Sequence, residues 1–285
     1  MVSIAQYRLE VYNGISFPFK IPGIRCFMRG VILAGGLAKR MLPASKVINK
    51  HLMPVYMDAI GAVPMIYFPL NTLIKSGIKE ILIVTSEKSA GMMVDMLGDG
   101  NKFGENVDFT YKVQNMNNEK RPVGIAGALK LARVFTENEK FAVILGDNFF
   151  EDSFEKEIKQ FESGRHVGHI FLKSVNDPER FGVVNMNSNN EIIDIEEKPN
   201  NPKSNYASTG MYLFDKAVYN IANNLVVSNR KELEIVDIHN QLIARKELSL
   251  SFVNKFWHDL GTPKSIRFAE KYLQQVNFEF EFPVN

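Results

Sequence analysis

The chain has 285 residues, of which 45% are hydrophobic and 23% are charged. This balance is that of a soluble globular protein, and the length fits one large α/β unit or a core with a small lobe. The formal net charge is only +2, so nothing indicates binding to nucleic acid or to an anionic membrane. No apolar run approaches about 20 residues, so we expect no membrane span. The single cysteine, Cys26, excludes an internal disulfide and favours a reducing compartment, the cytoplasm.

The first 27 residues differ from the rest. They contain alternating apolar residues, two prolines and scattered charges, without the apolar core of a secretory signal. Met28 directly precedes the first apolar strand pattern, so we predict that 1–27 is an extension. A loosely packed extension is favoured over a functional arm. We expect one domain over 28–275, with halves 28–150 and 151–275, followed by a short tail at 276–285.

The stretch 30–54 holds the clearest local pattern. The apolar run 31–34 predicts a buried parallel strand, and the Gly35-Gly36 pair then allows a sharp turn whose amides can approach a ligand. Four cationic side chains follow: Lys39, Arg40, Lys46 and Lys50. Because turn amides hold oxygens and cations neutralise charge, this arrangement suits a bound polyphosphate.

Strands and helices alternate from residue 30 to 145. The expected strands are 31–34, 80–85, 107–113 and 141–145, and the expected helices lie near 65–76, 90–97 and 125–135. Strand, helix and strand in series predict parallel pairing with right-handed crossovers, hence an α/β fold with a doubly wound, mainly parallel sheet. Ligands bind such sheets at the carboxyl ends of the strands, where Gly35-Gly36 and Asp147 both fall.

Past residue 150 the pattern becomes richer in strands. The expected strands are 169–175, 182–187, 191–197, 207–214 and 248–255, and the expected helices are 154–163, 216–223, 234–245 and 263–274. No repeat, low-complexity tract or long linker separates the two halves, so the sheet is predicted to be mixed and to continue through one domain.

Three side chains have both a chemical and a structural interpretation. Asp147 follows a buried strand, where a carboxylate is costly unless it is paired, and together with Asp259 it could hold one Mg²⁺. Asp147 could equally be a turn former in Gly-Asp-Asn. Lys198 could bind an anion or belong to a solvated charge run. Gln114 could read a base edge or be a polar strand end.

Taken in order, these segments resemble the sugar-1-phosphate nucleotidyltransferases, from about Arg29 to Phe268. The matching stretches are 33–36, 64–70, 97–100, 111–114, 145–148, 175–184, 196–199, 203–207, 209–210, 232–235 and 257–262. The resemblance implies a Rossmann-like fold with an inserted β-rich part that supplies a sugar-sized pocket. It also implies transfer of a thymidylyl group from dTTP to glucose-1-phosphate, giving dTDP-glucose and pyrophosphate for deoxysugar and polysaccharide synthesis.

The resemblance further implies a role for each matching residue. The nucleotide would contact Leu33, Gly35, Gly36, Lys39, Arg40, Gln114 and Gly124. Catalysis would depend on Arg40, Lys50 and Asp147. The sugar phosphate would lie among Phe181, Gly182, Glu197, Lys198, Asn205, Thr209, Gly210 and Trp257. Mg²⁺ would be bound by Asp147 and Asp259.

The chain also departs from the family pattern. The phosphate loop usually reads Gly-Gly-x-Gly-Thr-Arg, whereas here Ala38 replaces a glycine and Lys39 a hydroxyl residue. Ala38 disfavours a positive φ, so lower activity or a changed nucleotide preference is one expectation. Insertions fall around 57–63 and 115–123, the second beside the expected base pocket. The short tail favours a homodimer over a tetramer.

Two other functions stay open beside thymidylyl transfer. One is transfer from UTP, or to another hexose-1-phosphate. The other is a non-catalytic regulatory homologue that binds a nucleotide sugar, as the altered loop allows. A Rossmann-type oxidoreductase is rejected, because the G-x-G-x-x-G spacing is absent and Lys50-His51 stand where an acidic residue is needed.

Overall fold

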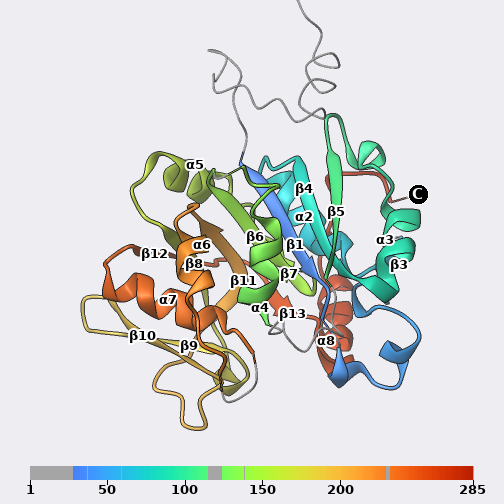
Figure 1. The fold of residues 1–285 in the computed structure, drawn as a ribbon. Helices are drawn as coiled ribbons and strands as arrows, with labels where there is room; N and C mark the ends of the chain where they lie inside the picture. The colour runs from blue at the N-terminus through green and yellow to red at the C-terminus, as the bar shows by residue number, and fades with distance from the viewer. Residues whose placement is uncertain are drawn as a thin grey trace, which may run out of the picture.

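The structure, a computed structural model, describes residues 28–36, 38–58, 60–114, 124–137, 139–228 and 232–284. A nine-stranded sheet runs through these residues, and two small sheets flank it (Figure 1). The strands are β1 (Arg29–Ala34), β2 (Pro54–Met57), β3 (Gly61–Pro64), β4 (Glu80–Ser86), β5 (Asp108–Gln114), β6 (Phe141–Leu145), β7 (Asn148–Phe150), β8 (Gly168–Ser174), β9 (Gly182–Met186), β10 (Ile192–Glu197), β11 (Tyr206–Phe214), β12 (Leu248–Phe252) and β13 (Trp257–Asp259). The predicted extension 1–27 and the insertion 115–123 lie outside the described residues.

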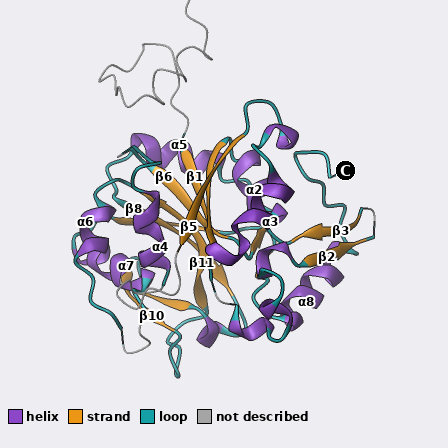
Figure 2. Ribbon diagram, turned by 45° about the vertical axis from the view of Figure 1, so that its right-hand side comes forward, coloured by secondary structure: helices purple, strands orange, loops and turns teal. Residues whose placement is uncertain are grey.

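Helices cover both faces of the large sheet (Figure 2). The α-helices are α2 (Tyr67–Lys75), α3 (Ala90–Leu97), α4 (Ile125–Leu129), α5 (Glu155–Ser163), α6 (Val218–Asn223), α7 (Ile235–Ala244) and α8 (Pro263–Leu273). Short 3-10 turns are η1 (Lys39–Met41), η2 (Ala44–Lys46), η3 (Lys50–Leu52), η4 (Glu87–Ser89), η5 (Asn101–Phe103), η6 (Lys130–Ala132) and η7 (Pro178–Arg180). Apolar residues of α2, α3 and α5 pack on one face of the sheet, and those of α4, α6 and α7 on the other.

Strand β1 lies at the centre of the sheet, which explains its uninterrupted apolar sequence. It pairs in parallel with β4 on one side and with β6 on the other, and β5 continues the parallel order beside β4. Val31 and Leu33 face one apolar cluster, whereas Ile32 and Ala34 face the other, so the run is buried on both sides. The predicted α/β fold with a mixed, mainly parallel central sheet is confirmed.

The second half adds antiparallel strands to this core. Strand β11 pairs antiparallel with β6, β8 and β9, and β10 forms a hairpin with β9 across the predicted turn at 187–190. Strand β12 extends the sheet beside β8, in parallel. The predicted helix 125–135 is wrong in its second part: α4 ends at Leu129 and continues as the 3-10 turn η6. Gly127 weakens the helix, and 3-10 turns are common at helix ends.

Two small sheets were not predicted. Strands β2 and β3 form a hairpin from part of the expected insertion 57–63, and the hairpin packs against α8 in a separate apolar cluster. Strands β7 and β13, three residues each, pair antiparallel with Asn148 opposite Asp259. This short ladder brings together two segments more than 100 residues apart, and it places Asp259 beside the carboxyl end of β6.

The segment predicted as a tail packs on the first half of the chain. Phe280 and Phe282 lie edge-on to Tyr67 of α2, and Phe278 contacts Phe149 of β7. The backbone N–H of Glu281 donates to the buried Asn71 side chain at 2.7 Å, which fixes the segment against α2. Within the described part of the chain, no helix has the length and apolar character to cross a membrane.

Candidate active site

A cleft of about 910 Å³ opens at the carboxyl ends of β1, β5 and β6. It is lined by many of the residues expected at the site: Leu33, Gly35, Gly36, Lys39, Arg40, Lys50, Gln114, Gly124, Asp147 and Lys198. The cleft therefore brings together, in one place, the expected nucleotide-binding residues and part of the expected sugar-phosphate set. Its position agrees with the rule that ligands of such sheets bind beyond the carboxyl ends of the strands.

The glycine turn after β1 packs closely against Gln114. A Cβ atom at Gly35 would lie 2.6 Å from the Gln114 Oε1 atom, so a larger residue there would displace this amide. Gln114 is held there by the last pair of the β4–β5 ladder, in which it lies opposite Ser86. The two expected nucleotide contacts thus touch each other, and the Gln114 amide stands at the wall of the cleft.

Ala38 adopts the left-handed conformation that its side chain disfavours. Its backbone has φ 48° and ψ 43°, and its carbonyl accepts hydrogen bonds from the Met41 N–H at 2.9 Å and the Ser45 hydroxyl at 3.0 Å. For an L-residue this conformation costs roughly 1 kcal/mol. Ala38 therefore keeps a glycine-like backbone despite the substitution.

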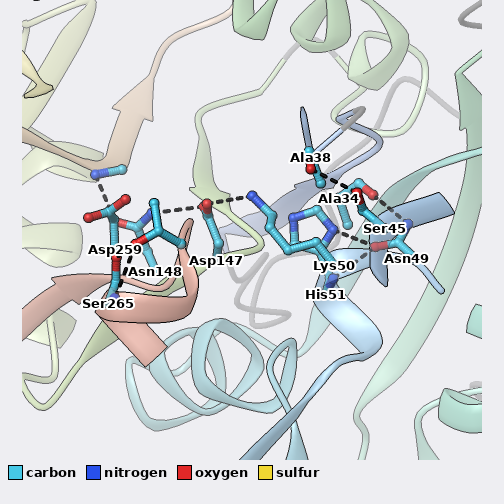
Figure 3. A network of polar contacts seen from close by, with 12 residues as sticks. Ala34, Ala38, Ser45, Asn49, Lys50, His51, Asp147, Asn148, Asp259 and Ser265 are labelled. Atoms are coloured by element: carbon cyan, nitrogen blue, oxygen red, sulfur yellow. Dashed lines mark hydrogen bonds and ion pairs between the residues drawn. The ribbon is translucent and has the colours of Figure 1, made fainter. Parts of the chain in front are cut away.

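Lys50 is fixed by a chain of hydrogen bonds that begins at the end of β1 (Figure 3). The Asn49 amide donates to the Ala34 carbonyl at 3.2 Å, and its oxygen accepts from the His51 backbone N–H at 2.9 Å. The turn η3 is thereby capped, and the Lys50 ammonium reaches the Asp147 Oδ2 atom at 2.6 Å. Both side chains of this ion pair are only 12% exposed.

His51 also lines the cleft, although it was not predicted as a site residue. Burial, reinforced by the Lys50 charge, lowers the pKa of His51 to about 3, so the ring is neutral. Its Nδ1 atom lies 2.8 Å from the Asn49 oxygen. A Cβ atom at Gly146 would lie 2.7 Å from the His51 ring, so glycine is required where β6 ends. The neutral His51 ring therefore has a packing role next to the Lys50–Asp147 pair.

The carboxylates of Asp147 and Asp259 converge near Gly261. A Cβ atom at Gly261 would lie 2.9 Å from Asp259 Oδ2, 3.3 Å from Asp147 Oδ2 and 2.8 Å from the Arg40 guanidinium. Burial is the largest single effect on Asp147 and opposes its ionisation, but the charge and hydrogen bond of Lys50, together with the charges of His51 and Arg40, outweigh it and hold the pKa well below its usual range. Burial, together with the nearby Asp147 charge, raises the pKa of Asp259 to about 6.

The two carboxylates have the donor chemistry that Mg²⁺ prefers. Among the described residues no cluster of three or more His, Cys, Asp or Glu side chains could hold a metal alone. Two oxygen ligands that face one point suit an ion that keeps part of its water shell and takes its other ligands from substrate phosphates. Burial is the main cause of the raised pKa of Asp259, and repulsion from Asp147 adds to it; a divalent cation would relieve this repulsion.

The expected sugar-phosphate residues divide into two groups. Lys198 lines the cleft, and its ammonium lies 2.9 Å from Glu197 Oε1. A Cβ atom at Gly182 would lie 3.5 Å from Glu197 Oε2, so the carboxylate stands above this glycine. The backbone N–H of Lys198 donates to the Phe181 carbonyl at 2.9 Å, which joins η7 to the end of β10.

The other expected sugar-phosphate residues either form hydrogen bonds behind the cleft wall or lie outside the cleft. The Trp257 indole and the Gly210 N–H both donate to Asn148 Oδ1, at 2.7 and 3.1 Å. Thr209 is buried and donates to the Phe171 carbonyl, whereas Asn205 is exposed and is absent from the walls of the cleft.

Several cleft residues were not predicted: Ala38, His51, Ile125, Ala128, Leu145, Glu179, Arg180, Glu232 and Gly261. Of these, Arg180 contacts a proposed metal ligand directly, through a 2.6 Å hydrogen bond from Nη2 to Asp259 Oδ1. A sequence signal for it existed, because Arg180 lies within the matching stretch 175–184 and a buried carboxylate such as Asp259 requires a partner.

The chain belongs to the nucleotidyl transferase family, which it matches over residues 29–276. It is 37% identical over 252 residues to a glucose-1-phosphate thymidylyltransferase of Neisseria meningitidis, an alignment covering 87% of this chain and 83% of that protein. A relative of the same name from an Actinoplanes species is 36% identical, with 88% and 79% covered.

Solved structures give the same result. One from Bacillus anthracis, provisionally assigned as a glucose-1-phosphate thymidylyltransferase and bound to sucrose, has a TM-score of 0.80 and 42% identity, covering 90% of this chain and 98% of that one. A UDP-glucose pyrophosphorylase in complex with UDP-glucose has a TM-score of 0.72 at 21% identity, covering 86% and 98%, which shows the shared fold alone.

Proposed function

We propose that this protein transfers a thymidylyl group from dTTP to glucose-1-phosphate, giving dTDP-glucose and pyrophosphate. The observation that carries the proposal is the convergence of a glycine turn, cationic side chains and Asp147 in one cleft, with Asp259 beside Gly261 of the cleft wall. Relatives of 36–37% identity named for this reaction support the choice of substrates.

The nucleotide is proposed to lie along the wall made by Leu33, Gly35, Gln114 and Gly124. Gln114 offers one donor and one acceptor to a pyrimidine edge, and the Gly35 amide can approach a phosphate without a Cβ in the way. Gly124 has φ 128°, and a Cβ there would lie 2.5 Å from the Leu233 carbonyl, so this wall too depends on glycine.

In the reaction, an oxygen of the sugar phosphate forms a bond to the α-phosphorus of dTTP while the bond from that phosphorus to pyrophosphate breaks. Two anionic reactants repel each other, so positioning and positive charge should supply most of the catalysis. Arg40 and Lys50 line the cleft, and the proposal assigns them to neutralising charge on the triphosphate. Mg²⁺, held by Asp147 and Asp259, would supply Lewis-acid stabilisation of phosphate oxygens.

The sugar phosphate is assigned to the opposite wall. Lys198 can contact its phosphate, and the adjacent Glu197 can accept hydrogen bonds from sugar hydroxyls. Trp257 and Gly210 act through Asn148, whose amide donates to Asp147 Oδ1 at 3.3 Å. They are therefore positioning residues for the proposed metal ligand.

A panel of nucleotides and sugar phosphates, with pyrophosphate release as the readout, tests this assignment. We expect turnover with dTTP and glucose-1-phosphate, and its loss in Asp147→Asn. Turnover with UTP alone would replace the thymidylyl assignment by the uridylyl one. No release with any pair, from a protein that still binds dTDP-glucose, would indicate a regulatory homologue. Light scattering tests the expected homodimer.

A further inference from the structure

The two carboxylates proposed to bind Mg²⁺ each form an ion pair with a cationic side chain of the protein. Asp147 is paired with Lys50, whereas Asp259 Oδ1 accepts from Arg180 Nη2 at 2.6 Å. Arg180 is not among the residues assigned above to binding or catalysis. It contributes a positive charge inside the cleft, and its side chain is 27% exposed.

Arg180 is held at three points. Besides Asp259, its Nη1 atom donates to Asp177 Oδ2 at 2.6 Å, and its guanidinium lies 5.0 Å from the centre of the Phe181 ring. Asp177 and Phe181 belong to the same short segment as Arg180, whereas Asp259 comes from β13. The guanidinium can therefore leave Asp259 and still be retained by its local contacts.

Arg180 also lies next to the wall assigned to the sugar phosphate. Phe181, which follows it, accepts a backbone hydrogen bond from Lys198, and both Lys198 and Arg180 line the cleft. Released from Asp259, the planar guanidinium would face the same space as the Lys198 ammonium. A guanidinium matches the oxygens of a phosphate with paired hydrogen bonds.

A metal ion on Asp259 Oδ2, the oxygen that faces Asp147, would share one carboxylate with Arg180, which is bonded to Oδ1. A divalent cation held by Asp147 and Asp259 would cancel the negative charge that attracts the guanidinium and would introduce a positive charge nearby. Binding of the metal therefore weakens the Arg180–Asp259 pair, and the incoming sugar phosphate offers the displaced guanidinium a new anion.

We propose that Arg180 is a phosphate-binding residue that alternates between Asp259 in the metal-free protein and the sugar phosphate in the metal-loaded one. This inference rests on the proposed metal site at Asp147 and Asp259. It makes metal binding and capture of the sugar phosphate mutually supporting, because the first releases a ligand for the second.

Two measurements on the full-length protein test the proposal. Mn²⁺ binding, followed by electron paramagnetic resonance without substrates, reports competition for Asp259. We expect Arg180→Gln to bind Mn²⁺ about tenfold more tightly than the unmodified protein, and Arg180→Lys to bind with intermediate affinity, because lysine keeps the charge but cannot bridge Asp177 and Asp259. Arg245→Gln, which removes an exposed charge at the end of α7, should leave the affinity unchanged.

Steady-state kinetics with saturating metal report whether Arg180 binds the sugar phosphate. In Arg180→Gln we expect the KM for glucose-1-phosphate to rise at least tenfold, with the KM for dTTP within twofold. An unchanged Mn²⁺ affinity, or equal changes of both KM values, would overturn the proposal. If the unmodified protein binds no Mn²⁺ at all, the metal site itself is absent, which refutes that part of the proposed function separately. Arg180→Lys provides the comparison should the glutamine variant fold poorly.

Discussion

The buried ion pair of Lys50 and Asp147 allows a quantitative prediction about stability. At a separation of 2.6 Å the two charges attract by about 6 kcal/mol in a medium of effective dielectric constant 20. Desolvation of two nearly buried ions offsets several kcal/mol of this attraction. Removing one partner leaves the other charge buried and unpaired, which typically costs about 3–5 kcal/mol. In Lys50→Met the cost should lie at the lower end of this range, because the charge of Arg40 still acts on Asp147.

We therefore expect Lys50→Met to lower the free energy of unfolding by about 3 kcal/mol, and the double variant Lys50→Met/Asp147→Asn to recover most of that loss. Urea unfolding followed by circular dichroism measures all four members of the cycle. The exposed helical pair Glu155–Lys159 is the matched control, and its cycle should show no resolvable coupling. Equal couplings in the two cycles would refute the reasoning, because burial would then have no effect.

Ala38→Gly should relieve the left-handed strain and retain full turnover, with the free energy of unfolding raised by up to about 1 kcal/mol; a large loss of turnover would contradict the glycine-like loop. Phe282→Ala should destabilise the protein by about 3 kcal/mol in urea unfolding, since the buried ring packs on Tyr67 and Phe103, whereas the exposed Val134→Ala should have little effect. Burial lowers the pKa of His239 to about 3, so acidification below the unfolded value near 6.5 favours the unfolded state, at about 1.4 kcal/mol per pH unit. His239→Phe should reduce this slope between pH 6 and 4, and an unchanged slope would show that the ring is protonated in the fold. Chelation by EDTA should abolish pyrophosphate release, and added Mg²⁺ should restore it.

Sequence patterns predicted the parts of the site that depend on local order. Gly35, Arg40 and Asp147 follow strands whose apolar runs are evident, and each lies at the predicted carboxyl edge of the sheet. The meeting of Asp147 with Asp259 depends instead on the β7–β13 ladder, whose three-residue strands are too short for a periodic signal.

Side-chain partners were harder to predict than elements. Arg180 lies in a matching stretch, but it is 79 residues from Asp259, and the sequence does not show that these two side chains meet. Asn205 illustrates the opposite case, since it lies in a matching stretch but does not line the cleft. A motif identifies a residue type at a position, whereas packing of distant segments decides where that side chain points.

The Asn148 oxygen has a consequence for how the protein folds. It accepts from Gly210 and Trp257, which lie 62 and 109 residues further along the chain. The neighbour of the proposed metal ligand is therefore fixed only after three remote segments have come together. A fragment ending near residue 150 would have the glycine turn and Asp147 yet leave Asn148 without these partners. Competence for metal binding should consequently appear late in refolding and vanish with the first cooperative loss of structure in the second half.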